Sequence, residues 1–297
     1  MEQSVEVRVL SAAHFCYTIF MFWLLIIVNL FLPTNSLAQD ATASATLPAI
    51  ASATAGPIPT PTPNILLQYQ TDYLYQRDLY QQAYLTYINK RQVHTKYQSL
   101  TTQRDKLIAT KNALLARNNL LKSYLVALRV SLDAHKSQNA TETEKNQIEI
   151  SKWENYFDEQ NSVVSALNNE DDIKKWAGDF KNRYIQIQQV TYTALVQNEV
   201  NHKTALLFDL SQLASAIQSS PSLKPEGQNW FSNLPVKIDL VNTALSEALA
   251  QTRRSQNQYN FINFYPNAKT ELNKANNYLR EINADLKSIV IKHWQKS

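Results

Sequence analysis

Residues 107–132 read LIATKNALLARNNLLKSYLVALRVSL, and this stretch decides the fold class. Apolar side chains recur there at alternating intervals of four and three residues, and leucine holds six of the eight positions, at 107, 114, 121, 125, 128 and 132. This is the heptad spacing of an α-helix that buries one stripe against another helix. Lys111 and Asn118 interrupt the stripe. We interpret them as register-setting polar positions whose side chains reach solvent.

The same spacing recurs over most of the chain that follows residue 64. Two further runs are Val196, Val200, Lys203, Leu207, Leu210, Ala214, Ile217 and Ala268, Leu272, Ala275, Leu279, Ile282, Leu286, Ile289. Residues 64–220 contain no proline and one glycine, Gly178. Strand-rich folds need frequent turns, and nucleotide-binding α/β folds need glycine loops, so both are close to excluded. The sequence therefore predicts an all-α fold.

Within residues 64–297 the pattern predicts three long helical arms, which cover 64–136, 141–220 and 236–296. Three consecutive arms of similar length joined by short turns favour an elongated antiparallel (up-down-up) long-helix bundle or coiled coil. The alternative is a compact four- or five-helix bundle, in which the chain also breaks at 168–172 and at Pro266.

Charge alternates between the three arms. The first carries 11 basic and 4 acidic residues, the second (counted over 137–220) 7 and 12, and the third 9 and 5. A middle arm that packs against both neighbours would favour this basic–acidic–basic order. Much of the apparent charge surplus of the arms is then balanced within the fold, and the formal net charge of the chain is +4. We therefore do not expect nucleic acid as a partner.

The N-terminus has the features of an export signal. Residues 15–32 are nearly all apolar, and small residues at Ser36 and Ala38 match a signal-peptidase site after Ala38. An apolar run of this length is also close to spanning length, so residues 1–38 are either a signal peptide or a retained N-terminal membrane anchor. The first Lys or Arg after the run is Arg77, which places the rest of the chain outside the cytoplasm.

The segment that follows, residues 39–63, consists almost wholly of Ala, Thr, Ser and Pro. Its alternating prolines at the end favour an extended, solvated backbone, which is typical of a semi-rigid spacer. A disordered tail left by signal cleavage is the alternative. Membrane contact is expected only through residues 15–32, and only if the signal is not cleaved.

No pattern in the chain indicates catalysis. The only cysteine, Cys16, lies in the apolar run, and His94, His135, His202 and His293 have no recognised ligand spacing. We expect no catalytic, cofactor-binding or metal-binding residues, and hence a protein that is not an enzyme. The acidic run at 170–172 is interpreted as a complement to the positive end of a helix that begins near Ile173, with cation binding as the alternative. Arg253 and Arg254 are interpreted as a solvated helix face.

One aromatic pattern is a candidate binding site. Five tyrosines share one face of the first arm, namely Tyr69, Tyr73, Tyr80, Tyr84 and Tyr87. They form either a wet coiled-coil core, with hydroxyl groups that reach water at the edge, or an exposed stripe that binds a glycan, a peptide or another copy of the chain.

These observations predict an exported, non-enzymatic structural or interaction protein that presents a coiled-coil rod outside the cytoplasm, whether secreted, periplasmic or at the cell surface. Its partner would be another protein or a second copy, held through the coiled-coil seams. The alternative is a module that binds a glycan or an anionic wall polymer through the tyrosine face.

Overall fold

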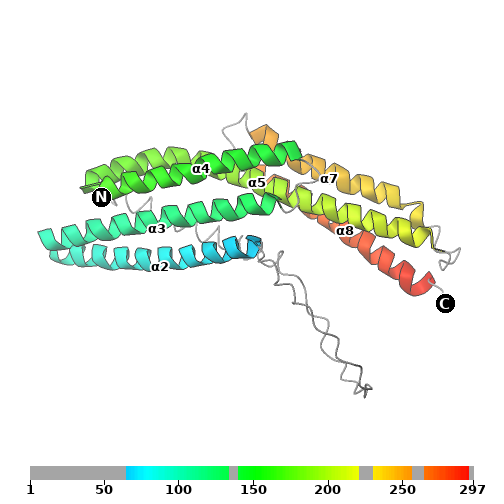
Figure 1. The fold of residues 1–297 in the computed structure, drawn as a ribbon, viewed down its shortest axis with the longest axis horizontal. Coiled ribbons are helices and arrows are strands. Elements are labelled where there is room, and N and C mark those ends of the chain that lie inside the picture. Colours follow the sequence, from blue (N-terminus) through cyan, green and yellow to red (C-terminus); the bar gives the residue numbers. More distant parts are fainter. Residues whose placement is uncertain (1–64, 134–139, 221–229, 256–263, 294–297) are drawn as a thin grey trace, which may run out of the picture. The chain divides into compact units, whose positions relative to one another are not determined.

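The computed structural model describes residues 65–133, 140–220, 230–255 and 264–293, and these ranges contain helices and no strand. The helices are α2 (Ile65–Tyr97), α3 (Leu100–Asp133), α4 (Ala140–Ala166), α5 (Glu170–Gln218), α7 (Leu234–Ser255) and α8 (Phe264–His293). They pack as in a bundle, with α2 on α3, α3 on α4 and α7 on α8 (Figure 1). The predicted all-α bundle class is confirmed.

The first part of α5, Glu170–Lys181, forms a compact unit distinct from residues 65–169 and 182–297, so it is described by itself. Glu170, Asp171 and Asp172 form its first turn, where the partial positive charge of the helix N-terminus favours carboxylates. Two turns later, Trp176 stacks on Phe180 with ring centroids 5.3 Å apart. The interpretation of the acidic run as a helix start is right.

The first predicted arm is two helices and not one. α2 ends at Tyr97 and α3 begins at Leu100, and the two helices pack against each other. Between His94 and Lys106 the sequence offers only Tyr97 and Leu100 as apolar residues, so a continuing helix would have no stripe to bury there. The prediction of a continuous helix over 64–136 is therefore wrong.

Two other breaks match the alternative architecture. α4 ends at Ala166 and α5 begins at Glu170, and Pro266 lies in the first turn of α8, where proline is tolerated. Lys111 Nζ donates to Ser165 O (2.7 Å) and to the carbonyl of residue 167 (2.8 Å), so it satisfies carbonyls at the end of α4. Lys111 thus has a partner on another helix instead of extending freely into solvent.

Contacts between side chains give the helix directions. α2 and α3 run antiparallel, because Tyr73 contacts Tyr124 whereas the later Lys90 pairs with the earlier Asp105. α3 and α4 run antiparallel for the same reason, since Lys122 pairs with Asp158 and Arg129 with Glu154. In contrast, α5 and α8 run parallel, as shown by Tyr192–Tyr265 and Glu199–Lys269. Three of these ion pairs join the basic first or third arm to the acidic second arm, as the charge order predicted.

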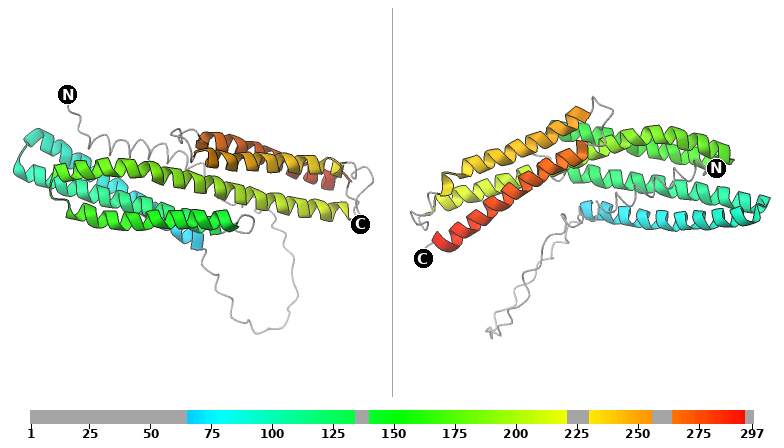
Figure 2. Two further views of the ribbon diagram at one scale, coloured as in Figure 1. Left: turned by 90° about the horizontal axis from the view of Figure 1, so that it is seen from above. Right: turned by 180° about the vertical axis from the view of Figure 1, so that it is seen from behind.

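The buried side chains follow the predicted seams. All seven positions of the seam in α8 and all seven of the seam in α5 are buried, Lys203 included. α3 buries a second stripe at the same spacing, because it packs against α2 and α4 at once (Figure 2). Asn118 is fully buried, so the interpretation that its side chain reaches solvent is wrong.

None of the helices in the described ranges is long and apolar enough to cross a membrane. The predicted signal or anchor at 1–38 and the predicted spacer at 39–63 lie outside the residues that the structure describes.

Candidate functional site

Three of the five tyrosines of the predicted binding face are buried. Tyr73, Tyr80 and Tyr87 are 6 %, 2 % and 1 % exposed, whereas Tyr69 and Tyr84 are half-buried. The interval of seven residues places the three buried rings on one side of α2, and the ring of Tyr73 packs edge-on against Tyr124 of α3. A buried ring cannot contact a glycan or a polymer. The binding-stripe hypothesis is therefore wrong for these three residues, which belong to the core.

A buried cation lies among the tyrosines of this core. Arg117 of α3 is 4 % exposed, and its guanidinium is 3.4 Å from Oδ1 of the buried Asn118. Burial disfavours the charged form and lowers the pKa of Arg117 to about 10, although the nearby hydroxyls of Tyr80, Tyr184 and Tyr156 oppose this shift. This arrangement encloses the polar groups and leaves them out of reach of a soluble ligand.

A second polar cluster lies where α5 meets α8. Glu199 accepts hydrogen bonds from Lys203 Nζ (2.6 Å to Oε2) and from Lys269 Nζ (2.7 Å to Oε1), and all three side chains are largely buried. Burial opposes the ionised carboxylate, but the two ammonium groups outweigh it and lower the pKa of Glu199. Because both ammonium groups bind the same carboxylate, the cluster joins α5 to α8 through ion pairs.

Aromatic rings extend the same contact. Tyr265 of α8 stacks on Tyr192 of α5, with ring centroids 4.6 Å apart and ring planes 17° apart. Burial raises the pKa of Tyr265, and the neighbouring carboxylate of Glu199 adds to the shift. The phenol therefore stays protonated at neutral pH, as a structural contact requires.

α5 is buried on every side over Ala194–Asn198. A helix that is buried all round lies inside the fold, with neighbours on opposite faces. On one side Asn201 donates to Thr143 Oγ1 of α4 (3.0 Å) and accepts from Gln197 (2.7 Å), and on another Glu199 holds Lys269 of α8. Asn201 and Glu199 thus link α5 to α4 and to α8.

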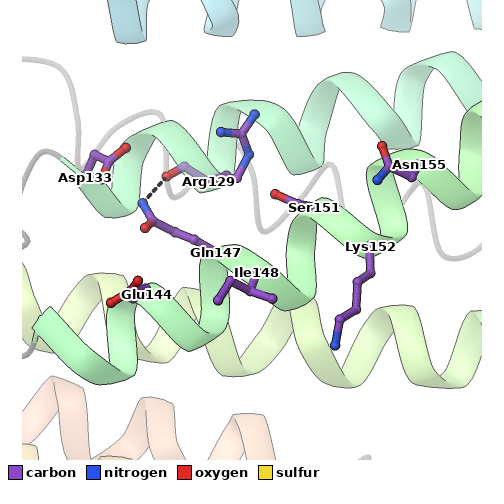
Figure 3. A pocket seen from close by; sticks show the side chains of 8 residues that line it. All are labelled: Arg129, Asp133, Glu144, Gln147, Ile148, Ser151, Lys152 and Asn155. Carbon is purple, nitrogen blue, oxygen red and sulfur yellow. Dashed lines mark hydrogen bonds between the residues drawn. The ribbon is translucent and has the colours of Figure 1, made fainter.

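A hollow of about 380 Å³ lies between the end of α3 and the start of α4 (Figure 3). It is lined by Arg129, Asp133, Glu144, Gln147, Ile148, Ser151, Lys152 and Asn155. The one guanidinium is already bound, because Arg129 donates to both carboxylate oxygens of Glu154 at 2.8 and 3.2 Å. This hydrogen bond raises the pKa of Arg129. Lys152 is paired with Glu149, so the cations of the hollow are committed to partners within the fold.

The other residues considered from the sequence do not come together. His94 Nδ1 lies 3.0 Å from Thr102 Oγ1, His202 is exposed on α5, and His135 lies outside the described residues. Within the described ranges, no group of three or more His, Cys, Asp and Glu side chains is placed to hold a metal ion. Arg253 is exposed at the end of α7, as expected for a solvated face.

The turn between α2 and α3 was missed by the sequence pattern. Gln98 has a φ of 45°, the left-handed conformation that ends many helices, and its amide donates to His94 O (2.8 Å). Ser99 Oγ then accepts from the amide of Thr102 (3.2 Å), and the amide of Ser99 donates to Thr102 Oγ1 (3.1 Å). This reciprocal cap starts α3. Ser99 and Thr102 match the capping-box signature only in part, because that signature has Glu or Gln at its last position, so the sequence contains little signal of this turn.

α2 exposes more large apolar side chains than any other described helix. Leu67, Leu74 and Leu85 are 59 %, 40 % and 62 % exposed, and their intervals of seven and eleven residues place them on one face. This outer face of α2, defined by these three leucines, lies about 120–140° around the helix from Tyr80 of the buried side. It is the described surface that most resembles an interface.

Comparison with known proteins adds no relative. No protein-family model matches the chain, and neither a curated protein nor a solved structure shows detectable similarity to it.

Proposed function

We propose that this chain is an exported, non-enzymatic interaction protein, which presents its helical bundle outside the cytoplasm and binds another protein through the outer face of α2. The exposed Leu67, Leu74 and Leu85 carry the proposal. Helix faces of this kind associate with a second helix, which buries the apolar side chains that are left in water.

The charges on α2 favour a second copy of the chain as the partner. Its first half contains Asp72, Asp78 and Arg77, of which Arg77 pairs with Asp78, so this half carries a net charge of −1, whereas Lys90, Arg91 and Lys96 lie in its second half. Two copies of α2 placed antiparallel would bring the acidic half of each against the basic half of the other. The proposed assembly is thus a symmetric dimer.

Export is supported by the apolar run at 15–32, by the small residues at Ser36 and Ala38, and by the lack of Lys and Arg from there to Arg77. Cell fractionation with intact mass measurement tests this part. We expect the chain outside the cytoplasm, either beginning at Gln39 or complete with its anchor. A full-length chain in the cytoplasm would contradict it.

Sedimentation velocity tests the interface. We expect the full chain to form dimers, and the triple variant Leu67→Gln, Leu74→Gln, Leu85→Gln to sediment as a monomer. The matched control changes three exposed apolar residues on other helices, Val163→Gln, Val236→Gln and Ile291→Gln, and should leave the dimer intact. Dimers in both variants would show that the outer face of α2 is not the dimer interface. A monomeric wild type would exclude a second copy of the chain as the partner.

A further inference from the structure

The end of the α2–α3 hairpin, here called the hairpin tip, comprises residues 90–106 and lies apart from the outer face of α2. The tip is a rigid feature, because the left-handed Gln98 and the reciprocal cap of Ser99 with Thr102 fix its backbone. An ion pair between Lys90 Nζ and Asp105 (2.7 Å) joins the two helices just behind the turn. Side chains at the tip are therefore held in defined directions.

Apolar side chains form the outermost part of the tip. Leu100 is 86 % exposed, the highest value among the large apolar residues of the described chain, and Tyr97 is 62 % exposed. Val93, one turn back, is 41 % exposed. Leaving these side chains in water is unfavourable, since removal of apolar surface from water lowers the free energy.

Basic residues surround this apolar end without acidic partners. Arg91, Lys96 and Arg104 form no ion pair with any described residue, and the Lys96 ammonium lies 5.1 Å from the ring of Tyr97. Asp105 is the one acidic residue between Asp78 and Asp133, a stretch that contains nine Lys and Arg residues, and it is already bound to Lys90. The charge balance between the arms therefore does not extend to the tip.

The tip also projects beyond the helix next to it. Lys111 binds the last carbonyls of α4, so α4 ends beside this position of α3. Lys111 follows Leu100 by eleven residues, which is a rise of about 16 Å along α3. The apolar end thus lies past α4 and can meet a flat surface.

We propose that the hairpin tip binds the surface of a membrane that contains anionic lipids. Leu100 and Tyr97 would enter the boundary between headgroups and acyl chains, while Arg91, Lys96 and Arg104 behind them would bind the phosphate layer. This order of apolar end and basic collar matches the order of acyl chains and headgroups in a bilayer. A soluble anionic polymer would bind the basic residues alone and would leave the exposed Leu100 in water.

A probe at the tip itself tests the proposal in the full chain. The single Cys16 is replaced by serine, Leu100→Cys is labelled with the environment-sensitive dye NBD, and the protein is titrated with phosphatidylcholine vesicles with and without phosphatidylglycerol. We expect a blue shift and protection from an aqueous quencher only when phosphatidylglycerol is present. The local probe separates the tip from any insertion of residues 15–32. NBD at Ile291→Cys, another exposed apolar position, is the control and should not shift.

Charge variants test the collar. The triple variant Arg91→Gln, Lys96→Gln, Arg104→Gln should bind the anionic vesicles about a hundredfold more weakly, as judged from the lipid concentration that gives half of the shift. The reason is that each basic residue near an anionic surface contributes about fivefold to the affinity. Lys145→Gln, Lys152→Gln and Lys274→Gln remove the same charge from exposed sites on other helices and should have little effect.

Three results would overturn the proposal. The first is a probe at position 100 that does not shift with anionic vesicles, and the second is one that shifts equally with neutral vesicles. The third is the observation that soluble polyphosphate binds through the three basic residues while anionic vesicles cause no shift. The ligand of the tip would then be an anionic polymer and not a membrane. Arg91 and Lys96 lie in the basic half of α2 that the proposed dimer also uses, but the probe reports on position 100 and the dimer test changes only the three leucines, so either proposal can fail while the other stands.

Discussion

The α7–α8 pair and the α2–α3 pair are both made of two helices in contact, but their cores differ in chemistry. α8 contributes alanine, leucine and isoleucine to its buried seam, and α7 contributes Val241, Leu245 and Ala248. The α2–α3 core instead contains three buried tyrosines, with the buried Arg117 near one of them, Tyr80. A purely aliphatic seam gains its stability from burial and shape, whereas a polar core must also satisfy every enclosed polar group. Mutations at equivalent depth should therefore act differently in the two pairs.

The largest effect is expected at Glu199, where the aliphatic α8 acquires a polar contact at its N-terminal end. Glu199→Gln leaves Lys203 and Lys269 as buried cations without a carboxylate and should lower the free energy of unfolding by about 3–5 kcal/mol. Urea denaturation at neutral pH measures this loss. The triple variant Glu199→Gln, Lys203→Met, Lys269→Met removes all three charges and should recover most of it.

The same residue gives a pH dependence with a definite sign. Because the folded protein lowers the pKa of Glu199 below its ordinary value of 4.5, the stabilisation is present above pH 4.5 and is lost as the pH falls through the folded pKa. Unfolding measured at neutral and at acid pH should show that the wild type loses more stability than Glu199→Gln does. Equal losses in the two proteins would show that Glu199 does not carry this dependence.

On the aliphatic side, Leu279→Ala should lower the free energy of unfolding by about 3 kcal/mol, from lost burial and a cavity in the α8 seam. Leu279 is 2 % exposed, whereas Leu240 of α7 is 41 % exposed, so Leu240→Ala is the matched control with a smaller expected loss. Chemical denaturation followed by circular dichroism compares the two. Similar losses would mean that the seam of α8 does not determine stability.

On the polar side, Arg117→Met should cost about 1 kcal/mol or less, although Arg117 is buried nearly as deeply as Leu279. The reason is that burial of the charged Arg117 already destabilises the wild type, as its lowered pKa indicates, and the substitution removes this desolvation cost. The same denaturation assay applies. If the free energy of unfolding fell as much as it does in Leu279→Ala, the two cores would not differ in their response to mutation as proposed.

The smallest effect is expected at the turn that makes the α2–α3 pair. Gln98→Gly should raise the free energy of unfolding by about 0.5–1 kcal/mol, because glycine adopts the left-handed conformation without steric cost. Gln103→Gly, a few residues later in regular helix, should instead lower it by about 1 kcal/mol. Thermal melting distinguishes the two signs. A loss at both positions would show that the turn gains nothing from glycine.

The aliphatic core could be predicted from the sequence and the polar core could not. The seam of α8 repeats apolar residues at helical spacing, and such a pattern has one physical solution, burial against another helix. Asn118 and Lys111 are different, because a polar residue in a stripe is compatible with solvent, with burial and with capping a neighbour. Only the position of α4 decides that Lys111 binds its last carbonyls.

The candidate surfaces show the same limit. The spacing of Tyr73, Tyr80 and Tyr87 correctly placed them on one face of a helix, but which side α3 would cover depends on the fold of the hairpin. That fold depends on Gln98 and Ser99, whose residue types are compatible with a continuous helix. Once the chain turns there, the tyrosines are covered, and Leu67, Leu74, Leu85 and Leu100 are left exposed.

The burial of α5 on every side has a consequence for amide hydrogen exchange. Along Ala194–Asn198, no face of the helix can be exposed to water by the loss of one neighbour, since contacts to α4 and to α8 lie within two turns of each other. Exchange at these amides requires an opening that separates both sets of contacts. These residues should therefore report the global unfolding of the bundle, while amides near helix ends exchange through local fraying.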